Sequence, residues 1–230
     1  MLFDTVDNTS TNTDAVATNT VNRTPRGLLR IVELYCRAKK QHQKEPNSQI
    51  PRSILRDLIS ALHYRDKNTF LHSQRVGQLA VGLARNLCWN EETQFHLEIA
   101  ALLHDIGKIG LPDHLLFKPA QFTGDETSLM ALGTEVANDI LQVCHAKPEL
   151  RRTIVESRMP FSFLEDQNRP LGKEICLAGR LLAVADVYES LSRNQVYRDA
   201  FSHEQIIAHL NDNAGTQFDP NIVTALTRWL

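Results

Sequence analysis

Apolar residues recur every three or four positions along most of the chain, which is the spacing of one buried face of an α-helix. Ile54, Leu55, Leu58, Ile59 and Leu62 mark one such face, in a helical region that begins near residue 51. No alternating run of convincing length indicates a strand, so the pattern predicts an all-α fold. The helices expected after this first one cover about 69–87, 91–106, 125–144, 148–158, 174–193, 203–211 and 219–229.

The N-terminal part of the chain differs from the rest in composition. Residues 1–26 are rich in Thr, Asn, Asp and Ser and hold few large apolar side chains. Such a segment cannot bury enough surface to offset the entropy cost of ordering it, so we predict a disordered tail. Residues 27–48 carry an apolar stripe followed by basic residues, which predicts an N-terminal helix that docks on the main domain or pairs with a second copy. The main domain is expected over 52–230.

Composition and charge exclude several classes of protein. A net charge of −2 creates no field that would attract nucleic acid, so no nucleic-acid partner is expected. No apolar run reaches the roughly 18 residues of a membrane span, and no basic-then-apolar leader opens the chain. These features predict a cytoplasmic protein without a membrane partner. The four cysteines (Cys36, Cys88, Cys144 and Cys176) lack paired spacing and favour reduced core thiols over disulfides.

The candidate chemistry is concentrated around residue 104. His104 and Asp105 close the apolar run 99–103, and Lys108 follows three residues after the aspartate. An imidazole nitrogen and a carboxylate oxygen are ligands that a borderline divalent metal accepts. An ammonium group nearby can neutralise a phosphate oxygen held by that metal. Alone, this pair is equally compatible with a capped helix end, so its interpretation depends on partners elsewhere in the chain.

Two further residues suit the same ion. His72 lies early in the second predicted helix, and Asp186 lies within the apolar run 181–187. Burying an unpaired carboxylate costs several kcal/mol, so Asp186 needs a cation. A bound metal meets that need, and so would an arginine such as Arg180 or Arg193.

In this order on a helical scaffold, His72, His104-Asp105 and Asp186 resemble the metal quartet of the HD phosphohydrolase superfamily. The flanking stretches are similar to its HD-GYP branch, whose members hydrolyse cyclic di-GMP using two or three metals. The resemblance implies an HD-domain helical bundle in which the quartet binds metal. The resembling stretches include 72–76, 103–113, 116–119, 178–187, 197–198 and 215–220.

The chain departs from the family pattern at positions that the resemblance assigns to other metals and to substrate. Gly133 stands where the family has a metal-binding histidine, and residues 155–160 contain no histidine where the family has a His-His-Glu run. Asn68 replaces an acidic ligand of some members, and Gln195 replaces an arginine that meets substrate phosphate. The Gly-Tyr-Pro loop is absent from 161–170. The ligands of the first metal remain, and those of the second and third are lost.

The first functional hypothesis is a metal-dependent phosphohydrolase with a single-metal site. One divalent ion (Mn, Fe, Co, Ni or Zn) would activate water as the nucleophile. The resemblance implies catalytic roles for Asp105 and Lys108 and substrate binding by Lys108, Lys118 and Arg198. It suggests cyclic di-GMP as the substrate, while the departures leave another nucleotide or phosphate ester open. A homodimer or a signalling partner is compatible with this hypothesis.

The second hypothesis belongs to a different class. The fold would serve as a catalytically inactive signalling or scaffold module, and the quartet would be a structural metal site or a remnant of one. Metal content and turnover of phosphodiester substrates separate the two hypotheses.

Overall fold

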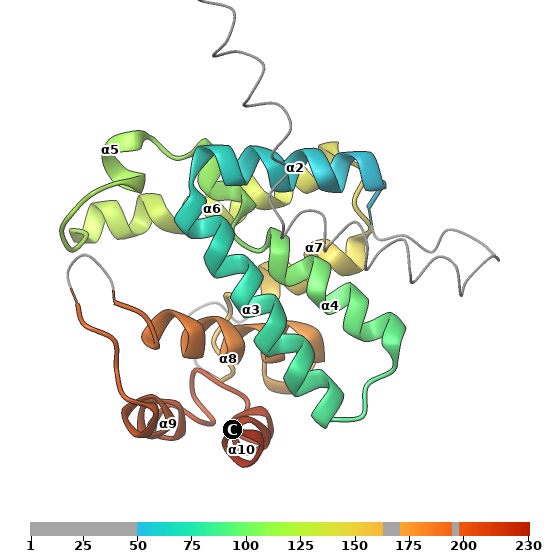
Figure 1. Cartoon of the computed structure of the whole chain (residues 1–230), viewed down its shortest axis with the longest axis vertical. Helices are drawn as coiled ribbons and strands as arrows, with labels where there is room; N and C mark the ends of the chain where they lie inside the picture. Colours follow the sequence, from blue (N-terminus) through green and yellow to red (C-terminus); the bar gives the residue numbers. More distant parts are fainter. Residues whose placement is uncertain (1–49, 163–170, 195–197) are drawn as a thin grey trace, which may run out of the picture. The chain divides into compact units, whose positions relative to one another are not determined.

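A computed structural model describes residues 50–162, 171–194 and 198–230 of the chain (Figure 1). The predicted tail and N-terminal helix, over 1–26 and 27–48, lie outside these residues, as does Gln195. The helices in chain order are α2 (Arg52–Arg65), α3 (Lys67–Asn86), α4 (Glu91–Leu103), η1 (Ile106–Gly110), α5 (Asp113–Leu116), α6 (Gly124–Val143), α7 (Pro148–Glu156), η2 (Gly172–Glu174), α8 (Leu177–Leu191), α9 (His203–Asp212) and α10 (Pro220–Trp229).

The predicted all-α class is confirmed, since the described ranges contain helices and no strand. The clearest difference from the expected bounds concerns the helix predicted over 91–106, because α4 ends at Leu103. Asp105 leaves the helical conformation, with φ −105° and ψ 12°, and its carbonyl oxygen accepts from the N–H of Lys108. This hydrogen bond starts the 3-10 helix η1, so the helix direction changes at the aspartate of the candidate site.

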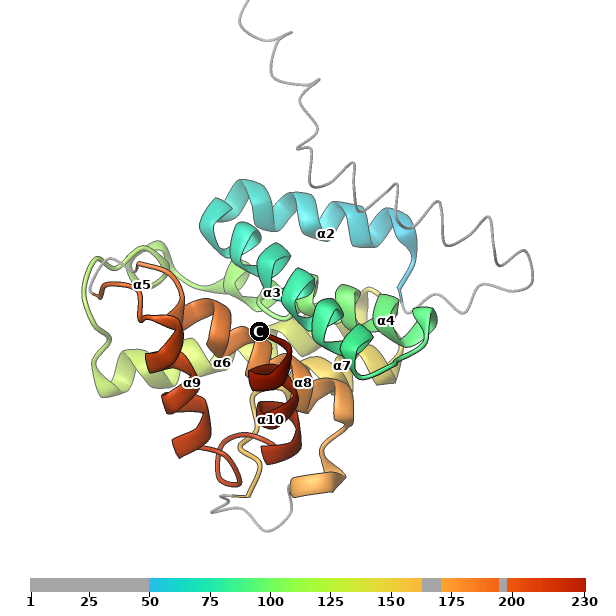
Figure 2. The same cartoon turned by 60° about the horizontal axis from the view of Figure 1, so that its bottom comes forward.

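The interior is built around α3 and α4. α3 packs against α2, α4 and α8, while α4 is buried on nearly every side of its last two turns. Figure 2 shows α9 and α10 side by side, where both contact α8. The end of α4 and the middle of α8 therefore both lie against α3. No helix within the described ranges is both long enough and apolar enough to span a membrane.

The cysteine prediction is partly wrong. Cys88, Cys144 and Cys176 are free thiols, and Cys36 lies outside the described residues. Cys88 is exposed because it lies in the turn after α3, with φ 57°, and not on the buried face of the helix.

The 3-10 helix η1 lies very close to α6 at Gly107. A Cβ atom added to Gly107 would lie 1.8 Å from the carbonyl oxygen of Gly133 and 2.7 Å from the backbone nitrogen of Ala137. Backbone atoms cannot rotate aside as a side chain can, so this contact requires glycine. The contact holds η1, and with it Asp105 and Lys108, against α6.

We expect Gly107→Ala to lower the free energy of unfolding by about 3 kcal/mol, because the methyl group would force the backbones of η1 and α6 apart. Urea denaturation followed by circular dichroism measures this loss. Gly124→Ala is the matched control, since an added Cβ there meets nothing within 4 Å. The control should change stability by less than about 1 kcal/mol. Equal stability of the two variants would show that η1 and α6 are not packed this closely.

Candidate metal centre

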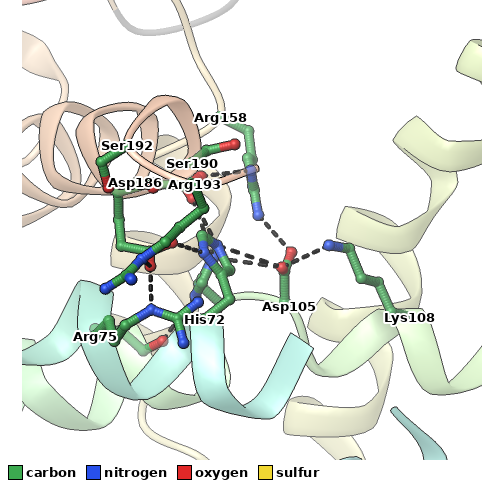
Figure 3. A network of polar contacts seen from close by, with 12 residues as sticks. His72, Arg75, Asp105, Lys108, Arg158, Asp186, Ser190, Ser192 and Arg193 are labelled. Atoms are coloured by element: carbon green, nitrogen blue, oxygen red, sulfur yellow. Dashed lines mark hydrogen bonds and ion pairs between the residues drawn. The ribbon is translucent and has the colours of Figure 1, made fainter. Parts of the chain in front are cut away.

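The predicted quartet comes from α3, from the residues directly after α4, and from α8, and Figure 3 shows His72, Asp105 and Asp186 close together. Asp66 caps the start of α3 by accepting two backbone N–H bonds, and His72 follows in the second turn. His104 and Asp105 lie directly after the end of α4, and Asp186 lies within α8. Because α3 packs against both α4 and α8, side chains far apart in the sequence face the same point.

Three of these side chains bring one ligand atom each to within 4.8 Å of the others. Oδ1 of Asp186 lies 2.9 Å from Nε2 of His72 and 3.6 Å from Nε2 of His104. Ligands about 2.1 Å from a tetrahedral metal lie about 3.4 Å apart, so the spacing is close to that of a shared ion. Two imidazole nitrogens and a carboxylate oxygen also suit a borderline divalent metal.

The hydrogen bonding of His104 leaves its Nε2 facing the candidate ion position between His72 and Asp186. Its Nδ1 donates to the carbonyl oxygen of Ala101 at 2.7 Å, which places the proton on Nδ1 and a lone pair on Nε2. Only 1% of the His104 side chain is exposed, and Nε2 has no hydrogen-bond partner in the described part of the chain. A buried lone pair without a partner costs free energy, and a metal ion would satisfy it.

Asp105 borders this cluster. Its Oδ2 lies 3.5 Å from Nε2 of His104 and 3.9 Å from Nε2 of His72. The same oxygen accepts from Nζ of Lys108 at 2.7 Å, while Oδ1 accepts from Arg158 at 2.7 Å. The structure thus places the fourth predicted ligand beside the other three and pairs it with the predicted catalytic lysine.

Glu189, which was not predicted from the sequence, holds His72 in place. Its Oε2 lies 2.6 Å from Nδ1 of His72, and the same buried carboxylate pairs with Arg75 and Arg193. A carboxylate behind a ligating imidazole fixes the orientation and tautomer of the ring. Glu189 lies three residues after Asp186 and therefore on the same face of α8, and this spacing could have identified it from the sequence.

Asp186 obtains its cation from Arg158, which the sequence did not identify. Nη1 of Arg158 donates to Oδ2 of Asp186 at 2.9 Å. The suggested partners Arg180 and Arg193 are wrong, because Arg180 pairs with the aspartate that caps α10 and Arg193 pairs with Glu189. Both arginines are close to Asp186 in sequence, but each has another carboxylate within reach.

The other two predicted substrate ligands make contacts outside this cluster. Lys118 pairs with Glu126 at the start of α6. Arg198 donates to two carbonyl oxygens at the C-terminal end of α8, and its guanidinium carbon lies 4.8 Å from the ring centre of Phe201. Their roles in substrate binding stay predictions.

The charges of the cluster keep both aspartates ionised. Burial alone would raise the pKa of Asp105 and Asp186, because it disfavours the charged form. Positive charges overcome this effect and hold both pKa values well below the ordinary range. Lys108 contributes most for Asp105, the hydrogen bond from His72 lowers the pKa of Asp186, and Arg158 acts on both.

The pKa of His72 moves in the opposite direction to that of the aspartates. Burial alone would lower the pKa of His72, but hydrogen bonds to Asp186 and Glu189 and the charge of Asp105 raise it from 6.5 to about 9 in the metal-free protein. A folded-state pKa above the unfolded value means that protonation of His72 stabilises the fold. This contribution is complete below about pH 6.5 and is lost as the pH rises through about 9.

We therefore expect the chelator-treated protein to lose up to about 3 kcal/mol of unfolding free energy through His72 between about pH 6.5 and 9.5. Urea denaturation at a series of pH values measures this loss. His72→Gln is the control, because its side chain does not titrate and its profile should be shallower. Parallel profiles of the two proteins would contradict the raised pKa.

A pocket of about 470 Å³ opens beside the cluster, which is within the range of small-molecule sites. Arg158 and Asp186 line it, so a ligand in the pocket would lie next to the candidate metal centre. The remaining lining residues are Ser157, Met159, Pro160, Ala183, Val187, Thr216, Gln217 and Phe218.

Comparison with known protein families matches the HD domain to residues 50–222, which is most of the chain. The chain belongs to the HD-domain family. This HD domain is 32% identical to the cyclic di-GMP phosphodiesterase response regulator RpfG of Xanthomonas campestris pv. campestris, over 77% of the chain and 47% of that relative. It is 30% identical to 3'3'-cGAMP-specific phosphodiesterase 2 of Vibrio cholerae, over 76% of the chain and 34% of that relative. The predicted HD-GYP branch is confirmed.

Among solved structures, the HD domain resembles that of the L. monocytogenes phosphodiesterase PgpH in complex with cyclic-di-AMP. The TM-score is 0.54 at 15% identity, over 75% of this chain and 92% of that chain. At this identity the likeness shows the fold alone, and it confirms the predicted HD-domain helical bundle. The chain spans about half or less of the length of the two curated relatives, 47% and 34%.

Proposed function

We propose that this HD domain is a metal-dependent phosphodiesterase with a single-ion site, acting on a cyclic dinucleotide or a related phosphate ester. The observation that carries the proposal is the buried Nε2 of His104, which has no hydrogen-bond partner in the described ranges and faces Asp186 and Nε2 of His72. The substrate class is supported by the relatives, which are named for cyclic di-GMP and 3'3'-cGAMP.

In this proposal His72, His104 and Asp186 hold one divalent ion, with Asp105 beside them as the fourth predicted ligand. When bound, such an ion supplies Lewis-acid polarisation of a phosphoryl oxygen and activation of water. Glu189 keeps the proton of His72 on Nδ1, so that Nε2 stays available for the ion. The metal identity (Mn, Fe, Co, Ni or Zn) remains part of the prediction.

Asp105 and Lys108 are the proposed catalytic pair. The Lys108 ammonium lies 2.7 Å from Oδ2 of Asp105 and keeps that carboxylate ionised at the edge of the cluster. An ionised Asp105 can orient a water molecule at the ion, and Lys108 can offset charge that develops on the phosphoryl oxygens. The pocket beside Asp186 provides room for the ester.

The proposal is tested by metal analysis of the purified chain, followed by assays with bis-p-nitrophenyl phosphate, cyclic di-GMP, 3'3'-cGAMP and cyclic di-AMP. We expect about one divalent ion per chain and turnover of at least one phosphodiester, with a linear product seen by chromatography. Absence of a bound ion together with absence of turnover under every added metal would overturn it.

One observation favours a second function, that of an inactive signalling or scaffold module. Arg158 and Lys108 neutralise Asp105 and Asp186 without any ion, and His72 bridges two carboxylates. The fold therefore has protein cations for its buried carboxylates. A metal-free chain that melts at the same temperature with and without chelator, and hydrolyses none of the four substrates, would support this function.

A further inference from the structure

Arg158 bridges the two aspartates of the metal centre (Figure 3). Its Nη2 donates to Oδ1 of Asp105 at 2.7 Å, and its Nη1 donates to Oδ2 of Asp186 at 2.9 Å. The other oxygens of the same two carboxylates, Oδ2 of Asp105 and Oδ1 of Asp186, face Nε2 of His72 and of His104. We call the two oxygens that contact Arg158 the outer oxygens and the two that face the histidines the inner oxygens. The guanidinium of Arg158 thus lies on the outer side of the carboxylate pair, and the candidate ion position lies on the inner side.

The outer side of these carboxylates is where a second ion would have to bind. In two-metal sites the ions lie about 3.5–4 Å apart and share ligands. Here the outer oxygens already accept hydrogen bonds from a fixed positive charge, which would repel a divalent cation at that distance. Gly133 and residues 155–160 also lack the histidines that the family resemblance assigns to further metals.

Arg158 is anchored on one side and accessible on the other. The side chains of Asp105 and Asp186 are 6% and 16% exposed, whereas that of Arg158 is 37% exposed. The exposed part of Arg158 lines the pocket of about 470 Å³. A guanidinium keeps its charge at every relevant pH and pairs well with phosphate oxygens.

We propose that Arg158 is a built-in cation that replaces a second metal ion: it neutralises Asp105 and Asp186 and contacts a substrate phosphate oxygen from the pocket. This inference rests on the proposed single-ion function. It assigns to Arg158 the second positive charge of that site, the first being the ion. A fixed guanidinium stabilises charge on a phosphoryl oxygen, but it does not activate water. Water activation therefore remains with the single ion.

The first test is the number of ions bound. Titration calorimetry with Mn²⁺ should give one equivalent for the wild-type chain and a second, weaker equivalent for Arg158→Gln, because the two outer oxygens become available, without added histidines, and the repulsion is removed. Arg151→Gln is the matched control: it removes one positive charge from α7, the helix that ends just before Arg158, at a residue that donates to the neutral side chains of Asn138 and Gln142. The control should stay at one equivalent. An unchanged stoichiometry and affinity in Arg158→Gln would overturn the inference.

The second test is stability without metal. In the presence of chelator Arg158→Gln should melt well below Arg151→Gln, because two buried carboxylates lose a shared cation. Added Mn²⁺ should then raise the melting midpoint of Arg158→Gln by about 5 °C more than that of the wild-type chain. Equal Mn²⁺-induced shifts in the two proteins would count against Arg158 as a substitute for an ion.

Arg158→Lys keeps the experiment decisive if Arg158→Gln does not fold. It retains the charge and loses the fork that pairs with two oxygens, so the chain should still bind one Mn²⁺. Its KM for bis-p-nitrophenyl phosphate should rise at least about tenfold, because the phosphate contact is weakened. An unchanged KM would overturn the substrate contact.

The outcomes separate this inference from the proposed function. One equivalent of Mn²⁺ in Arg158→Gln and none in the wild-type chain would support Arg158 as the cation of the site and overturn the single-ion hydrolase. One equivalent in both, at equal affinity, would overturn the role of Arg158 and leave the hydrolase standing. No binding to either protein would overturn both.

Discussion

Asp186→Asn is expected to abolish binding of the divalent ion and to lower kcat/KM for a phosphodiester by at least about 10³-fold. Among the described residues, Oδ1 of Asp186 is the one carboxylate oxygen that lies within 4 Å of Nε2 of both histidines and is hydrogen-bonded to neither Lys108 nor Arg158. A neutral amide supplies a weaker ligand and no negative charge, so the two imidazoles would have to hold the ion with Asp105, whose Oδ2 is already paired with Lys108. Metal analysis and the bis-p-nitrophenyl phosphate assay measure both effects.

Asp139→Asn provides the matched control for this variant. Asp139 is an exposed aspartate of α6, so the substitution makes the same chemical change away from the cluster. The control should keep its ion and its turnover within about twofold, since surface substitutions of this kind have small effects. An Asp186→Asn chain with full metal content and activity would remove Asp186 from the ligand set.

Glu189→Gln should produce the second large effect, a loss of about 3 kcal/mol in unfolding free energy together with a 10- to 100-fold weaker affinity for the ion. The Glu189 side chain is only 6% exposed and pairs with two arginines as well as His72. Replacing it by an amide leaves Arg75 and Arg193 without this carboxylate and puts an uncharged group, which can present either its oxygen or its NH2, where an acceptor-only carboxylate fixed the Nδ1 proton of His72. Urea denaturation and Mn²⁺ titration measure the two losses separately.

The comparison with Glu135→Gln isolates the role of burial. Glu135 is an exposed glutamate of α6, and its replacement should change stability by less than about 0.5 kcal/mol and leave metal affinity unchanged. If Glu189→Gln lost stability but kept full affinity for the ion, the carboxylate would be a structural anchor with no influence on His72.

Helices were predictable because the signals that form them are local. A buried stripe at helical spacing and a capping residue act within one or two turns, as in α6, where Thr123 and Glu126 form a capping box at the start. The end of α4 was less predictable, since the apolar pattern continues through Ile106 while the backbone leaves the helix at Asp105. Just beyond this departure η1 packs closely on α6 at Gly107, a tertiary contact that the local apolar pattern does not contain.

By itself the sequence determined the all-α class, the HD-domain family and the four residues that approach one another, because residue type and local periodicity carry that information. Only the tertiary structure decided which groups neutralise and orient them. Arg158 pairs with residues 28 and 53 positions away, and Glu189 holds His72 across 117 positions. Such pairs depend on how α3, α7 and α8 pack, and no local spacing in the chain encodes that packing.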